Sequence, residues 1–96
     1  MNKQKIYVGN LPYRTDDQEL QETFAQFGEI EEAVVIRYRK SGRSKGYGFV
    51  TFTTEDAAEN ALKLDGEELQ GRRMFVKIAH QEETQQDEFV NEHHDS

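Results

Sequence analysis

The most informative part of the sequence runs Lys45-Gly46-Tyr47-Gly48-Phe49-Val50-Thr51-Phe52. Its aromatic and β-branched residues predict a strand over residues 47–53. Successive side chains of a strand point to opposite faces, so Tyr47, Phe49 and Thr51 share one face, and Val50 and Phe52 share the other. This strand therefore carries aromatic rings on both of its faces.

Three more strands are predicted around this one, at residues 6–8, 30–38 and 74–79. Two helices are predicted between them. The first follows a capping box in which the Thr15 hydroxyl accepts a backbone N–H and Gln18 reaches back, and it ends at Gly28. The second begins after Thr53 or Thr54 and stops near residues 65–66, and a short hairpin-like turn at Gly71 precedes the last strand. The order β-α-β-β-α-β predicts an α+β, ferredoxin-like sandwich: a four-stranded antiparallel sheet with two helices on one face.

The apolar pattern divides the sheet into a covered and an uncovered face. The side chains expected in the core are Ile6, Val8, Leu20, Phe24, Phe27, Ala33, Val35, Val50, Phe52, Leu62, Met74 and Val76. By the same alternation Tyr7, Tyr47 and Phe49 meet on the other face, and Phe75 and Lys77 extend that face at one edge. Exposed aromatic rings are costly unless a ligand stacks on them, and unpaired nucleic-acid bases stack at about 1–3 kcal/mol each. Gly46 and Gly48 leave room for a nucleotide or for the adjacent helix.

The charge is unevenly distributed. The net charge of the 96 residues is −7. Residues 1–80 contain 12 basic and 13 acidic side chains, while residues 81–96 contain 6 acidic ones and no lysine or arginine. Between Arg37 and Lys45 there are five cations and no anion. An acidic protein therefore carries a local basic segment that suits a phosphate backbone.

The segment 45–52 matches every place of the octamer signature of the RNA recognition motif, K/R-G-F/Y-G/A-F-V-x-F/Y. The companion hexamer reads Ile6-Tyr7-Val8-Gly9-Asn10-Leu11. Over residues 4–80 the chain resembles this family, in particular its small bacterial and plant-type glycine-rich members. It departs from the family at Tyr38, where an acidic residue is common, and this departure makes the loop at 37–44 more basic and more aromatic.

The resemblance implies binding of single-stranded RNA by a non-enzymatic monomer, in post-transcriptional regulation or as an RNA chaperone. Tyr7 and Phe49 would each stack on a base, Tyr47 would lie against the sugars, and Lys45 would pair with a phosphate. Backbone groups around residues 79–81 would read base edges. The residues expected to contact RNA are Tyr7, Asn10, Arg37, Tyr38, Arg39, Lys40, Arg43, Lys45, Tyr47, Phe49, Phe75, Lys77, Ala79 and His80.

Other ligands and functions fit the sequence less well. Single-stranded DNA stays open, because stacking does not distinguish it from RNA. A basic protein partner could dock on the acidic surface of the two helices, which consists of Asp16, Asp17, Glu19, Glu22, Glu55, Asp56 and Glu59. No motif places a nucleophile beside a base, and adjacent His93-His94 make a weak metal site, so neither catalysis, a metal nor a cofactor is expected.

The sequence also predicts where the protein is located and where its domain ends. The longest apolar run, Ala33–Ile36, is too short for a membrane span, and the folded pattern begins near Lys5. A cytoplasmic location is therefore expected: the bacterial cytosol, or the cytosol and nucleus of a eukaryote. Residues 1–80 are expected to form the domain and residues 81–96 a disordered acidic tail. That tail, which includes Phe89, could fold back onto the basic segment and the aromatic face.

Overall fold

The computed structural model describes residues 3–79. The expectations for His80, for the acidic tail 81–96 and for His93-His94 lie outside the described residues. Within them, neither helix has the length and apolar character needed to cross a membrane.

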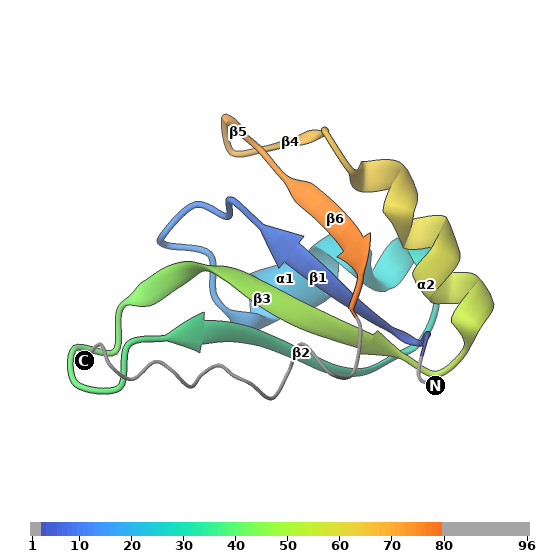
Figure 1. Cartoon of the computed structure of the whole chain (residues 1–96), viewed down its shortest axis with the longest axis horizontal. Helices are drawn as coiled ribbons and strands as arrows, with labels where there is room; N and C mark the ends of the chain where they lie inside the picture. The colour runs from blue at the N-terminus through green and yellow to red at the C-terminus, as the bar shows by residue number, and fades with distance from the viewer. Residues whose placement is uncertain (1–2, 80–96) are drawn as a thin grey trace.

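The described residues form one four-stranded antiparallel sheet in the order β2-β3-β1-β6. The strands are β1 (Lys5–Gly9), β2 (Ile30–Arg37), β3 (Ser44–Phe52) and β6 (Phe75–Ile78). Helix α1 (Asp17–Phe24) is followed by the turn η1 (Ala25–Phe27), and helix α2 (Glu55–Ala61) is followed by η2 (Leu62–Leu64). In Figure 1, α1 lies behind the strands, and α2 is seen to the right of β6. A separate hairpin of β4 (Glu68–Leu69) and β5 (Arg72–Arg73) leads into β6. The predicted ferredoxin-like sandwich is confirmed.

The core lies between the helices and one face of the sheet. Ile6 and Val8 on β1, and Val50 and Phe52 on β3, are completely buried. Burial alternates along β3 over its whole length, as the pattern predicts for a sheet covered on one side. The helices contribute Leu20, Phe24, Ala57, Ala58 and Ala61 to the same cluster.

The start of α1 differs from the prediction by one residue. Asp16, not Thr15, caps this helix: its carboxylate accepts the Glu19 N–H at 2.9 Å. Thr15 is fully buried, and its hydroxyl has no hydrogen-bond partner among residues 3–79. The expected box fails because the chain turns back at the preceding proline, where the Thr15 N–H donates to the Pro12 carbonyl at 3.0 Å. At α2 the cap is Thr54, one of the two predicted residues, and it accepts the Ala57 N–H at 3.2 Å.

Strand β3 begins at Ser44 rather than at the predicted Tyr47. The β2–β3 connection is shorter than expected because it closes as a tight hairpin. The Tyr38 N–H donates to the Arg43 carbonyl at 2.8 Å, and the Gly42 N–H donates to the Tyr38 carbonyl at 2.9 Å. As a result, Lys45 projects from a strand and not from a loop.

Candidate nucleic-acid interface

Three aromatic rings meet on the face of the sheet that the helices leave open. The ring centroids of Tyr7 and Tyr47 are 5.7 Å apart, those of Tyr7 and Phe49 5.9 Å, and those of Tyr47 and Phe49 6.1 Å. All three rings are half-buried, so each keeps part of its surface accessible to solvent. We call these three residues the platform. The structure thus brings together the three aromatic residues that strand alternation placed on one face.

Strand register explains why the rings meet. Tyr7 on β1 lies directly across from Phe49 on β3, and on its other side it lies across from Lys77 on β6. The next residue of β1 on this face is Gly9, and a Cβ there would lie 2.5 Å from the Tyr7 hydroxyl. The Tyr7 ring therefore leans over Gly9, the position across from the exposed Phe75. This explains a glycine at that place in the hexamer.

Two lysines lie against aromatic rings of this face. The Lys5 ammonium is 4.9 Å from the centroid of Phe49, and the Lys45 ammonium is 5.2 Å from the centroid of Tyr38. Both distances are within the range in which a cation is attracted to a ring face. Each ammonium group therefore lies over an aromatic ring, and positive charge and aromatic surface occur together on this part of the domain.

The protonation of the platform phenols reflects their surroundings. Partial burial raises the pKa of the Tyr7 hydroxyl above its ordinary value. Burial also raises the pKa of Tyr47, and negative charge on Tyr7 and Tyr38 raises it further. Both phenols are therefore neutral at physiological pH, and no negative charge on them repels a phosphate.

A hollow of about 320 Å³ lies at one end of the platform, and it includes residues that the sequence analysis missed. Tyr13, from the β1–α1 loop, is 68% exposed, and the Arg72 guanidinium lies 5.8 Å from its ring centroid. Arg72 also donates to the Asn10 side-chain oxygen at 2.6 Å. The sequence did not predict a role for Arg72, because its contacts with Asn10 and Tyr13 join two loops that are far apart in the sequence.

The remaining predicted residues occupy different environments. Asn10 is engaged on both ends of its side chain, since its amide also donates to the Arg73 carbonyl at 2.7 Å. Ala79 is buried and its N–H donates to the Lys5 carbonyl at 2.9 Å, so only its carbonyl is left for a base edge. The other predicted residues on the sheet edge and the β2–β3 hairpin are exposed: Phe75, Lys77, Arg37, Tyr38, Arg39, Lys40 and Arg43.

The two glycines of the octamer have a structural explanation. Both lie on the covered face of β3. A Cβ on Gly48 would collide with the Val34 carbonyl and approach Leu20 of α1 to 3.1 Å. Gly46 has a φ of +89°, and a Cβ there would lie 3.2 Å from the Tyr13 ring. Of the two predicted uses, close approach of a neighbouring element is therefore the one that the structure shows.

Comparison with known proteins agrees with this geometry. A model of the RNA recognition motif family matches residues 6–74. "Glycine-rich RNA-binding protein 4, mitochondrial" of Arabidopsis thaliana is 51% identical over 76 residues, which are 78% of this chain and 56% of that protein. "RNA-binding protein 24" of Homo sapiens is 51% identical over 76 residues, which are 79% of this chain and 32% of that protein. The chain thus spans about half of the first relative and a third of the second.

Solved structures show the same architecture. The crystal structure of RNA Binding Protein PG1 superposes with a TM-score of 0.79 at 41% identity, covering 83% of this chain and 98% of that one. The Sxl-lethal protein in its complex with RNA superposes with a TM-score of 0.78 at 34% identity, covering 82% of this chain and 48% of that one. The octamer and the hexamer lie on the paired central strands β3 and β1, and the match to the family model runs from β1 to the residue before β6. The chain belongs to the RNA recognition motif family.

Proposed function

We propose that this domain binds single-stranded RNA on the platform. Bases stack on Tyr7 and Phe49, sugars pack against Tyr47, and Lys45 pairs with a phosphate. The observation that carries the proposal is the contact among the three rings, with centroids 5.7 to 6.1 Å apart, on the face of the sheet without helices. Hydrophobic burial does not explain this cluster, because the core lies on the other face. RNA is favoured over DNA by family membership and by the solved complex of the related Sxl-lethal protein.

The domain acts, in this proposal, as a monomeric binding module and not as an enzyme, within post-transcriptional regulation or as an RNA chaperone. Among residues 3–79 no three acidic or histidine side chains are grouped as metal ligands would be. Stacking of two or three bases, minus the entropy of ordering a flexible strand, corresponds to micromolar affinity, about −8 kcal/mol or weaker. In the same proposal, residues 1–80 form the domain and residues 81–96 a separate acidic tail. The proposed location is the cytoplasm, although two similar Arabidopsis thaliana proteins have "mitochondrial" in their names.

The acidic helical surface remains a weaker candidate for docking a basic protein. Two of its carboxylates already have structural partners, since Asp16 caps α1 and Asp17 accepts the Val35 N–H at 2.7 Å. Nothing in these contacts favours a protein ligand.

The test is an NMR titration of the full chain with random-sequence RNA of about six nucleotides, repeated with the equivalent DNA. We expect amide shifts concentrated at Tyr7, at residues 45–51 and at residues 75–79, with tighter binding of RNA. Equal or tighter binding of DNA would change the proposed class of ligand, but the platform would remain the proposed binding surface. Absence of shifts on the sheet at millimolar RNA would overturn the proposal, and shifts confined to the helices would move attention to protein docking.

Alanine variants then assign the energy to the rings. Tyr7→Ala and Phe49→Ala should each weaken RNA binding by about 1–3 kcal/mol, the usual contribution of one stacked base, measured by fluorescence anisotropy. Lys63→Gln is the control, because Lys63 is an exposed cation on η2, away from the platform. Because the platform rings are only half-buried, both alanine variants should keep their folded NMR spectra.

A further inference from the structure

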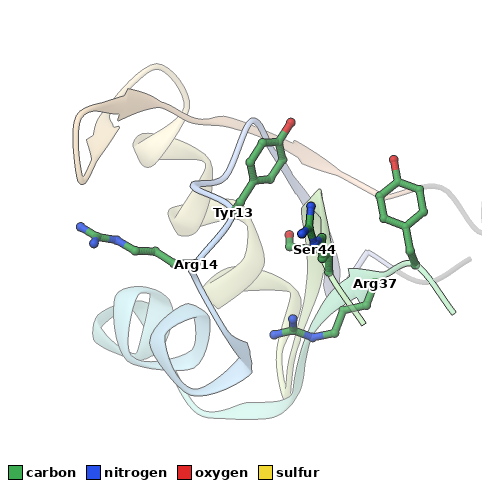
Figure 2. Close-up of a pocket in the computed structure, with 6 residues that line it drawn as sticks. Tyr13, Arg14, Arg37 and Ser44 are labelled. Atoms are coloured by element: carbon green, nitrogen blue, oxygen red, sulfur yellow. The ribbon is translucent and has the colours of Figure 1, made fainter. Parts of the chain in front are cut away.

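A second hollow lies beside the platform, between the β1–α1 loop and the β2–β3 hairpin. Its volume is about 490 Å³, within the range of small-molecule pockets, about 300–1,000 Å³. We call it the rim groove, and its lining residues are Tyr13, Arg14, Arg37, Tyr38, Arg43 and Ser44. Figure 2 shows Tyr13 and Arg14 leaving the β1–α1 loop in different directions, with Arg37 and Ser44 on the facing strand ends.

The chemistry of the rim groove suits one nucleotide. Its lining side chains include three guanidinium groups and two phenol rings, and no carboxylate. Tyr13 and Tyr38 are 68% and 54% exposed, so each ring keeps surface that a planar ligand can contact, although Arg72 and Lys45 each lie over part of one ring. Guanidinium groups pair with phosphate through several parallel donors, and aromatic rings stack on bases of any sequence.

The cations of the rim groove differ in how far they are already engaged. Arg14 is held at the outer edge, where its Nε donates to the Gln70 side chain at 3.2 Å. Arg37 donates from one nitrogen to the Gly42 carbonyl at 3.1 Å, and this bond fixes the guanidinium at the base of the hairpin while its other donors remain. Arg43 is placed by the closure of the same hairpin with Tyr38. Arg37 and Arg43 both line the groove from the β2–β3 hairpin, and the pair can offer donors to one phosphate.

The rim groove is continuous with the platform through Tyr13. This residue lines both hollows, and its ring lies over Gly46 at the start of the octamer. Arg72 lies near the same ring from the β4–β5 side. An RNA strand that extends from the platform past Lys45 would thus meet one more exposed aromatic ring, that of Tyr13.

We propose that the rim groove binds one further nucleotide of the same RNA strand, outside the sheet. Its base stacks on Tyr13 and its phosphate pairs with Arg37 and Arg43. The inference rests on the proposed function, because it concerns the strand already held by the platform. It implies that the binding site is longer than the sheet face, and that affinity rises when the RNA is long enough to enter the groove.

The test compares two single-stranded RNAs, of about four and about eight nucleotides, on the full chain and its variants by fluorescence anisotropy. The longer RNA offers more binding registers, but this statistical gain is the same for every variant. We expect Tyr13→Ala to weaken binding of the long RNA about tenfold, a loss of about 1.4 kcal/mol. The same substitution should weaken binding of the short RNA less than twofold. Tyr13→Phe, which keeps the ring, should restore the length dependence.

Charge variants test the phosphate contact. Arg37→Gln and Arg43→Gln should each weaken only the long RNA, while Lys63→Gln, which removes one cation on η2, changes neither affinity. If Tyr13→Ala weakens both RNAs equally, or neither, the groove does not bind a nucleotide although the platform stands. If neither RNA binds the unaltered chain, the proposed function itself fails, and the groove proposal with it.

Discussion

Gly48 lies where strand β3, strand β2 and helix α1 meet, and its hydrogen side chain is required by all three. A methyl group there would collide with the Val34 carbonyl and press on Leu20. At an open site, Gly→Ala stabilises a protein by about 0.4–1 kcal/mol, because it restricts the unfolded chain. Here we expect the opposite sign: Gly48→Ala should lower the free energy of unfolding by about 1–3 kcal/mol, the cost of overpacking a core. Urea denaturation measures the change, and a more stable variant would show that the layers have room.

The platform phenols give the stability a dependence on alkaline pH. Their pKa values are raised in the folded domain, mainly by burial, from an ordinary value of 10.0. As the pH rises through that value, the unfolded chain loses these protons first, so the unfolded state becomes relatively more favourable. The free energy of unfolding should therefore be unaffected by these groups below pH 10 and should fall above it.

The matched variant replaces both phenols, Tyr7→Phe with Tyr47→Phe, and keeps the rings. Urea unfolding at about pH 8 and about pH 11 should show a smaller loss of stability in this variant than in the unaltered chain. The two proteins differ only in these two hydroxyl groups, so the difference between their losses reports on the phenols. An equal loss in both would mean that these phenols are not shifted by folding.

Some residues of the candidate site could be predicted from the sequence, and others could not. Tyr7, Tyr47 and Phe49 were predictable because alternation in a strand fixes the face of each side chain. Tyr13 and Arg72 were not, because they approach each other from two loops, to 5.8 Å between guanidinium and ring, and no periodic pattern carries that contact. The octamer identified the strand that carries two rings of the platform, and the folded structure was needed to place Tyr13 and Arg72 at one end of it.

A side-chain cap at the start of helix α1 was predicted correctly, but the residue that caps the helix was not. Thr15 and Asp16 are both good capping residues by type, and the sequence favoured the hydroxyl. The structure gives the cap to Asp16 and buries Thr15. The Thr15 N–H is already bonded to the Pro12 carbonyl, so Thr15 belongs to the turn that precedes the helix and Asp16 is the residue at its start.

This assignment predicts different outcomes for the two neighbours. Asp16→Ala should lower the free energy of unfolding by about 1 kcal/mol through loss of the cap, whereas Asp16→Asn should nearly preserve it. Thr15→Val should be neutral or stabilising, because it removes a buried hydroxyl without a partner among the described residues and keeps the shape. Thermal or urea unfolding separates these cases. A large loss from Thr15→Val together with none from Asp16→Ala would restore the sequence-based cap.

For the whole molecule, the net charge of −7 says little about binding, because the charges are segregated. Residues 3–79 contain all 12 lysines and arginines, and five of these lie between Arg37 and Lys45. Three of those five, Arg37, Arg43 and Lys45, line the rim groove or its junction with the platform. In the proposed complex, a phosphate backbone would therefore meet a row of positive charges on a protein whose net charge is negative.

The salt dependence of RNA binding measures how many of these cations are used. Each phosphate neutralised on a single strand contributes about −0.7 to the slope of log affinity against log salt, so contacts from three cations predict a slope of about −2. Lys45→Gln should reduce the magnitude of the slope by about 0.7, and Lys63→Gln on η2 should leave it unchanged. Anisotropy titrations with the longer RNA at several salt concentrations give these slopes. A slope near zero would mean that stacking alone holds the RNA, and an equal response to both substitutions would mean that the protein acts through its overall charge rather than through this track.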